Sequence, residues 1–188
     1  MQYILMWKLI TFVIATGLLI YISRASLRQP YSHGFYRFFA WESILLLFLL
    51  NVEKWFLDPS SWHQLISWVL LFASFGPLIL GVRALRRRGG LTEERSDDPS
   101  LYAFERTSEL VTTGIYAYIR HPLYSSLFLL TWGIFFKALS LPGALLALVA
   151  TTFLIVTAMA DEQECIRFFG EGYRAYMRKT RRFIPFLF

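Results

Sequence analysis

The stretch PLYSSLFLLTWGIFFKALSLPGALLALVATTFLIVTAMA, residues 122–160, decides the fold. It consists of two long apolar runs that are separated only by Ser140 and Leu141. About 20 helical residues, each rising about 1.5 Å, cross a hydrocarbon core of about 30 Å. Proline is favoured in the first turn of a helix, and Pro122 and Pro142 stand where the two runs begin. The stretch therefore predicts a tight hairpin of two membrane-spanning helices.

Three further apolar runs precede this hairpin. The chain has 188 residues, of which 56% are apolar and 18% aromatic, and its mean hydropathy is +0.46. Soluble domains are usually about 45–50% apolar. Because no water satisfies an open backbone inside a bilayer, such runs must form helices, and we predict an all-α integral membrane bundle of about five transmembrane helices. The predicted spans are 3–23, 38–57, 62–82, 122–139 and 142–160.

The positions of the basic residues predict the orientation of the bundle. Of 19 Lys and Arg residues, 16 lie in the segments 24–37, 83–121 and 161–188. Cytoplasmic loops carry the excess of Lys and Arg, so we expect the N-terminus outside and the C-terminus, with the active site, in the cytoplasm. The formal charge of +6 is thereby explained by topology and lipid headgroups, and we expect no nucleic-acid partner.

A basic pair stands at the start of the fourth predicted span. Arg120 and His121 precede Pro122, so they lie beside the unpaired N–H groups and the positive dipole end of a helix. That combination attracts an anion. The alternative is that Arg120 marks the cytoplasmic border and binds lipid phosphate, with Tyr116 and Tyr124 as ordinary interfacial aromatic residues.

An acidic cluster stands at the other end of the hairpin. Asp161, Glu162 and Glu164 follow the fifth predicted span, where acidic side chains oppose the helix dipole. Ionisable residues at the edge of a span indicate function by default. The hairpin returns them beside Arg120 and His121, so we expect a pocket for a ligand that bears both charges. A ligand carboxylate would contact Arg120, and a cation would contact the acidic side chains and the aromatic faces.

Two motifs in this region resemble a known family. GIYAYIRHPLY (114–124), followed by DEQECIRFFGEGYRAYMRKTRRFIPF (161–186), resembles the isoprenylcysteine carboxyl methyltransferase family of integral membrane enzymes, which use S-adenosylmethionine. The resemblance covers about residues 105–188. It implies a methyltransferase-like cofactor-binding region in residues 101–188, preceded in residues 1–100 by transmembrane helices and a flexible loop. The implied function is methyl transfer from S-adenosylmethionine to a lipid-linked or small hydrophobic acceptor, in or at the lipid bilayer.

The resemblance also implies roles for individual residues. The implied catalytic residues are Arg120, His121, Tyr124 and Glu162. The implied cofactor contacts are Ser108, Glu109, Leu110, Val111, Tyr116, His121, Pro122, Leu123, Tyr124, Asp161 and Glu162. One departure concerns the acceptor: carboxylate-methylating relatives tend to carry an arginine four residues before the acidic pair, where this chain has Thr157. A carboxylate acceptor needs no base, whereas an amine or hydroxyl acceptor does, so the resemblance leaves the acceptor atom open.

Three other functions fit parts of the same pattern. A phospholipid N-methyltransferase shares the acidic pair and the architecture. A sterol-reductase-like NADPH enzyme shares RHPxY and a tyrosine-rich C-terminal block, but such enzymes are usually about twice as long. A non-catalytic membrane partner would keep the pocket without the reaction. His33 and His63 lie in or beside predicted loops without partners at ligand spacing, so we expect no metal site.

Overall fold

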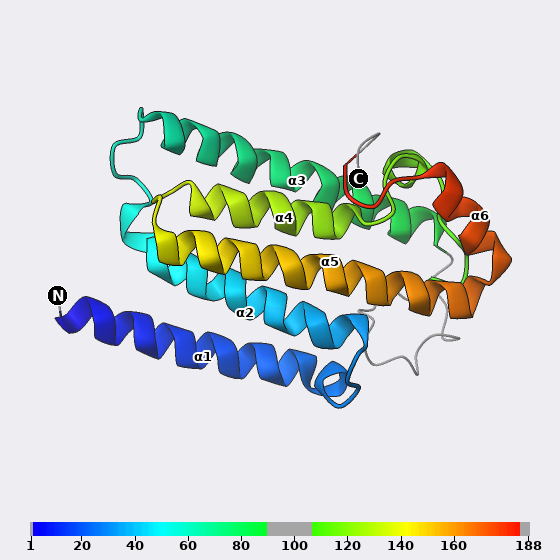
Figure 1. Ribbon diagram of the computed structural model, residues 1–188, viewed down its shortest axis with the longest axis horizontal. Coiled ribbons are helices and arrows are strands. Elements are labelled where there is room, and N and C mark those ends of the chain that lie inside the picture. The colour runs from blue at the N-terminus through cyan, green and yellow to red at the C-terminus, as the bar shows by residue number, and fades with distance from the viewer. Residues whose placement is uncertain (1, 90–106, 185–188) are drawn as a thin grey trace.

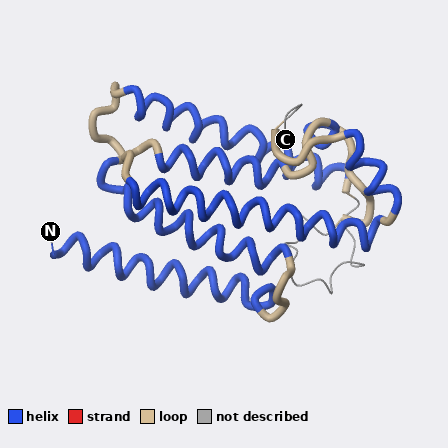
Figure 2. Tube along the Cα trace, in the orientation of Figure 1, coloured by secondary structure: helices blue, strands red, loops and turns tan. Residues whose placement is uncertain are grey.

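The computed structural model describes residues 2–89 and 107–184 (Figure 1). Within these residues every regular element is helical, as Figure 2 shows, which confirms the all-α prediction. Most of the flexible loop predicted before residue 100 lies outside the described residues. The elements are α1 (Gln2–Leu27), α2 (His33–Asn51), η1 (Val52–Lys54), α3 (Trp62–Arg88), η3 (Gly114–Ala117), α4 (Pro122–Phe135), α5 (Leu141–Phe169) and α6 (Glu171–Lys179).

The long helices lie side by side along the long axis of the molecule (Figure 1). The most extensive packing joins α2 to α5 and α3 to α4, whereas α1 packs mainly against α2 at one edge. The short helix α6 and the turn η3 lie together at one end of the bundle, which we call the site end. The turn between α4 and α5 lies at the opposite end, which we call the hairpin end.

Within residues 2–89 and 107–184, four helices are long and apolar enough to cross a membrane: α1, α2 with η1, α3, and α5. The fourth predicted span is wrong in length, because α4 ends at Phe135 instead of residue 139. Its 14 residues rise about 21 Å, which is less than the hydrocarbon core. The fifth predicted span is longer than expected, since α5 continues to Phe169. The chain is an integral membrane protein with four helices of spanning length and a shorter apolar helix, α4, among the described residues.

The centre of the bundle is packed with aliphatic and small side chains. Ala147 and Ala150 of α5 are fully buried and pack in one cluster with Leu47 of α2 and Leu71 of α3. A Cβ atom on Gly133 of α4 would lie 2.9 Å from the side chain of Leu71. The glycine therefore lets α3 and α4 approach closely, as small residues do between membrane helices. This contact fixes α4, and with it the start of α4 at the site end.

A buried lysine closes the hairpin end. Lys137 follows α4 directly and is only 1% exposed. Its Nζ donates a hydrogen bond to Oε1 of Gln64 at 2.9 Å and lies 3.4 Å from the ring centroid of Trp68. The side-chain amide of Gln64 donates in turn to the carbonyls of Lys54 and Lys137 at 2.9 and 3.1 Å. Because Lys137 turns into the bundle here, the chain leaves the helix before the end that hydropathy predicts.

Candidate active site

Residues 181 and 182, after α6, hydrogen-bond the backbone of residues 120 and 121, which lead into α4. Pro122 is the first residue of α4, as the sequence predicts, and His121 is its N-cap. The backbone N–H of Arg120 donates to the carbonyl of Arg181 at 2.8 Å. The backbone N–H of His121 donates to the carbonyl of Arg182 at 3.1 Å. The short parallel contact between these segments satisfies backbone groups near the helix start and fixes the two side chains Arg120 and His121 in place.

Glu162 is the centre of a buried ionic network. Its carboxylate accepts from Nε of Arg120 at 2.9 Å, and from Nε and Nη2 of Arg182 at 3.1 and 2.7 Å. Nε2 of His121 lies 3.3 Å from the same carboxylate. Glu162 is 2% exposed, so these partners compensate a charge that would be costly to bury alone. The structure thus joins the acidic cluster of α5 to the basic pair before α4.

His121 lies between two carboxylates. Its Nδ1 is 3.4 Å from Oδ2 of Asp161, and its ring stacks on Tyr124 with the centroids 5.4 Å apart. Burial lowers the pKa of His121, but the hydrogen bonds to Asp161 and Glu162 outweigh it and raise the pKa above the ordinary value. The two carboxylates therefore favour the protonated form of His121 at the start of α4.

Arg120 is engaged mainly by the protein itself. Besides the bond to Glu162, its Nη1 donates to the carbonyls of Met177 and Thr180, the former at 3.3 Å. Among the described residues no hydrogen bond uses its Nη2. Because Arg120 lines the pocket, its Nη2 group is available to donate a hydrogen bond to a ligand.

A pocket opens at the site end between the helices and the segment 107–121. Its wall contains nine of the residues implied by the sequence resemblance: Leu110, Val111, Tyr116, Arg120, His121, Pro122, Leu123, Tyr124 and Asp161. Three implied residues are not part of the wall. Ser108 and Glu109 directly precede Leu110 in the chain, and Glu109 is exposed, whereas Glu162 is held in the ionic network. The wall combines cationic, anionic and aromatic side chains on one cavity.

Seven further wall residues were not among the residues implied by the sequence: His33, Leu85, Thr107, Cys165, Phe169, Tyr173 and Tyr176. The helical spacing of aromatic residues in the tail was a usable signal for the last three. Helix α6 brings both tyrosines onto the pocket, and the hydroxyl of Tyr176 donates to the carbonyl of Tyr116 at 2.7 Å. Burial raises the pKa of Tyr173, so its hydroxyl stays neutral.

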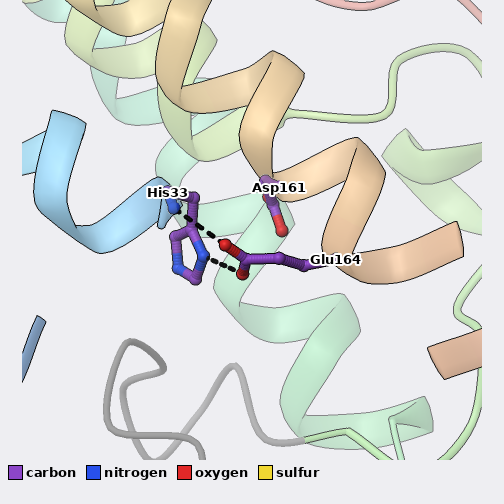
Figure 3. Close-up of side chains that lie close together, drawn as sticks. All are labelled: His33, Asp161 and Glu164. Atoms are coloured by element: carbon purple, nitrogen blue, oxygen red, sulfur yellow. Dashed lines mark hydrogen bonds and ion pairs between the residues drawn. The ribbon is translucent and has the colours of Figure 1, made fainter. Parts of the chain in front are cut away.

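His33 lies beside a loop, as expected, but the expectation that it has no partner at ligand spacing is wrong. It is the first residue of α2, is 1% exposed, and contacts Glu164 of α5, which is 131 residues away in the chain (Figure 3). The backbone N–H of His33 donates to Oε1 of Glu164 at 2.9 Å, and its Nδ1 hydrogen-bonds Oε2. No local sequence pattern signals a contact over that separation.

Asp161 lies beside this pair (Figure 3). Donor atoms of His33, Asp161 and Glu164 lie within 4.8 Å of one another, a spacing at which a cation can be bound. Both carboxylate oxygens of Glu164, however, already accept hydrogen bonds from His33. We therefore describe His33 and Glu164 as a hydrogen-bonded pair, of which His33 lines the pocket.

Comparison with known proteins bears on the same region. The phospholipid methyltransferase family model matches residues 98–171. The methanethiol S-methyltransferase of Crocosphaera subtropica is 32% identical over 76 residues, which make up 40% of this chain and 29% of that protein. The protein-S-isoprenylcysteine O-methyltransferase of Schizosaccharomyces pombe is 35% identical over 132 residues, 69% of this chain and 55% of that protein. The chain is similar to membrane methyltransferases.

This similarity confirms the resemblance inferred from the two motifs. The matched residues 98–171 include η3, α4 and α5, which carry much of the pocket wall. The chain spans about half or less of the length of the curated relatives it matches. No solved structure matches it.

Proposed function

We propose that the chain is an integral membrane methyltransferase that uses S-adenosylmethionine and acts on a lipid-linked or small hydrophobic acceptor. The observation that carries this proposal is the two-signed wall at the start of α4, where His121 lies between Asp161 and Glu162. All three residues lie in the segment that matches the phospholipid methyltransferase family. A pocket with both charges and several aromatic faces suits a small zwitterionic nucleoside better than it suits a lipid headgroup alone.

The residues present fit each part of S-adenosylmethionine. The positive dipole end at the start of α4 and Nη2 of Arg120 suit its carboxylate. Asp161 suits its ammonium group, and the faces of Tyr116 and Tyr124 suit the sulfonium or the adenine. When bound, the donor supplies an electrophilic methyl group on sulfur. Glu162 has a positioning role in this proposal, because it holds Arg120 and His121.

The origin of the pocket-wall residues along the chain supports two regions of different function. Among the described wall residues, only His33 and Leu85 come from the first hundred residues. This supports residues 101–188 as the cofactor-binding region and residues 1–100 as the part that supplies helices to the bilayer. Methyl transfer needs the donor sulfur, the methyl group and the nucleophile in line and dry, which the apolar walls of Leu85, Leu123 and Phe169 favour.

We further propose that the site end faces the cytoplasm. The basic segments that predict the orientation include the end of α3, with Arg86, Arg87 and Arg88, and the tail after α5. Both lie at the site end, whereas the N-terminus lies at the other end (Figure 1). S-adenosylmethionine would then load from the cytoplasm, and a lipophilic acceptor would reach it from the bilayer.

Binding of S-adenosylmethionine to the purified full chain in detergent tests the proposal. We expect thermal stabilisation by S-adenosylmethionine and none by NADPH. Asp161→Asn should weaken the affinity at least about tenfold, since it removes the carboxylate for the ammonium group. The matched control is Asp58→Asn, an exposed turn residue at φ 47 that asparagine tolerates, and it should bind normally.

Two results would contradict the proposal. Stabilisation by NADPH alone would favour a reductase, and stabilisation by neither compound would favour a non-catalytic membrane partner. Equal affinities in the two variants would remove Asp161 from the cofactor site.

A further inference from the structure

We propose that His33, held by Glu164, is the general base for an acceptor that is an apolar thiol. The inference rests on the proposed methyltransferase function and names its acceptor class. It concerns the only wall residue that α2 contributes among those described, on a helix for which the sequence shows no motif. Four observations carry it: the position of His33, its hydrogen bonds, the charges around it and the chemistry of the alternatives.

His33 comes from an element of the fold that supplies none of the residues assigned to the cofactor. Those residues come from the segment 107–121 and from α4 and α5, whereas His33 begins α2. At 1% exposure the imidazole is shielded from bulk water, yet it lines the cavity. A base must reach the acceptor proton while staying shielded from bulk solvent, and a buried imidazole on the cavity wall suits that role.

The hydrogen bonds of His33 fix its orientation. Glu164 bonds both the backbone N–H and Nδ1 of His33, so the ring cannot turn freely (Figure 3). Among the described residues no hydrogen bond uses Nε2 of His33. A carboxylate at Nδ1 selects the tautomer whose Nε2 carries the lone pair and stabilises the imidazolium formed after proton uptake. Glu164 is therefore a positioning residue, and Nε2 is the basic atom.

The charges around His33 disfavour an anionic acceptor. Asp161 and Glu164 of α5 lie beside it, and Arg37, one turn further along α2, acts on it electrostatically. A carboxylate acceptor brought beside His33 would approach these two carboxylates of α5. Before Asp161, α5 carries no basic residue. Thr157 stands at the position where carboxylate-methylating relatives tend to carry an arginine, and its hydroxyl donates to the carbonyl of Phe153. A neutral acceptor avoids this repulsion.

A thiol is the neutral acceptor that an imidazole can activate most readily. Thiols ionise near pH 8.5, about two units above histidine, whereas hydroxyl groups ionise far higher. A protonated apolar thiol also partitions into the bilayer, from which it can reach the pocket between helices. The chemistry named for one relative, methanethiol S-methyltransferase, is of this class.

The step balances without another reactant. The S–H bond of the acceptor breaks, its proton goes to Nε2 of His33, and its electron pair forms the new bond to the methyl carbon. The bond from that carbon to the donor sulfonium breaks, and its electron pair stays on the donor sulfur. The products are a methyl thioether, S-adenosylhomocysteine and the imidazolium of His33, which then loses its proton to water.

The experiment uses the full chain in lipid nanodiscs with labelled S-adenosylmethionine and three matched acceptors: octanethiol, octylamine and octanoate. We expect methylation of octanethiol above the other two. His33→Gln should lower kcat/KM for the thiol by at least about a hundredfold, the usual share of a general base, and abolish the rise of kcat/KM with pH. Its S-adenosylmethionine affinity, measured by thermal shift, should stay at the wild-type value.

Two variants separate a catalytic from a structural role. Free imidazole should restore part of the activity of His33→Ala, which it cannot do for a folding defect. Glu164→Gln should displace the pH profile while retaining part of the rate. The matched control is His63→Gln at the hairpin end, where His63 bonds Ser61 and the carbonyl of Phe136, and it should behave as wild type.

Several results would overturn the inference while leaving the proposed function intact. They are a wild-type pH profile in His33→Gln, preference for octylamine or octanoate, and loss of wild-type activity on chelation with recovery on adding a divalent cation. The last result would make His33, Asp161 and Glu164 metal ligands. Failure of wild-type protein to bind S-adenosylmethionine at all would instead overturn the proposed function.

Discussion

The bundle buries a basic side chain at each end, but in opposite surroundings. At the hairpin end, Lys137 lies against Trp68 and donates to the neutral amide of Gln64. At the site end, His121 lies between Asp161 and Glu162, and a pocket opens beside it. Burial lowers the pKa of Lys137, whereas two carboxylates raise the pKa of His121 despite its burial.

The difference teaches that a buried charge does not by itself mark an active site. Lys137 is enclosed by its partners, and it contributes to helix packing at the α4–α5 turn. The site end has ionisable side chains of both signs, and two of them, Asp161 and His121, line a cavity. Chemistry at a site needs compensated charges that remain accessible to a ligand, and among the described residues the site end meets that condition.

The largest expected effect comes from breaking the ionic network. Glu162→Ala should lower the free energy of unfolding by about 3–5 kcal/mol or prevent folding, because it leaves two guanidinium groups near a buried site without their carboxylate. Thermal unfolding in detergent measures this. Glu171→Ala, which removes an exposed ion pair with Arg174, is the control and should change little. Equal unfolding temperatures for the two variants would show that the network does not hold the site end together.

A smaller effect is expected at the hairpin end. Lys137→Met keeps the aliphatic chain but leaves Oε1 of Gln64 without its donor, so we expect a loss of about 1–3 kcal/mol in unfolding free energy. S-adenosylmethionine affinity should stay unchanged, because Lys137 is at the far end of the bundle from the pocket. A marked loss of affinity with normal folding would couple the two ends and contradict the contrast drawn between them.

The smallest effect is a pH dependence of opposite sign at the two ends. Because the pKa of His121 is raised on folding, its contribution to stability is complete below the ordinary histidine value of about 6.5 and is lost as the pH rises through the raised value. The unfolding-temperature advantage of wild type over His121→Gln should therefore shrink with rising pH. The comparison with Lys137→Met should show the reverse trend in alkaline buffer, since the pKa of Lys137 is lowered. Parallel trends would mean that one of the two environments is wrongly described.

Much of the fold followed from local patterns in the sequence. Apolar runs of spanning length predicted the helices, and Pro122 and the Ser140–Pro142 turn predicted where α4 and α5 begin. The same hairpin predicted that Arg120 and His121 would meet the acidic residues of α5, and the structure brings them together. These features depend on short-range chain geometry, which hydropathy and proline chemistry largely determine.

Only the tertiary structure decided which side chains share the pocket. The sequence alone determined a membrane-embedded helical chain, its basic and acidic motifs and their resemblance to methyltransferases. It did not determine that Glu162 is held in an ionic network and does not line the cavity, that Lys137 is buried where α4 ends, or that His33 meets Glu164 across 131 residues. Those outcomes depend on the rotation and register of helices packed against one another, because each contact joins residues that no local pattern relates.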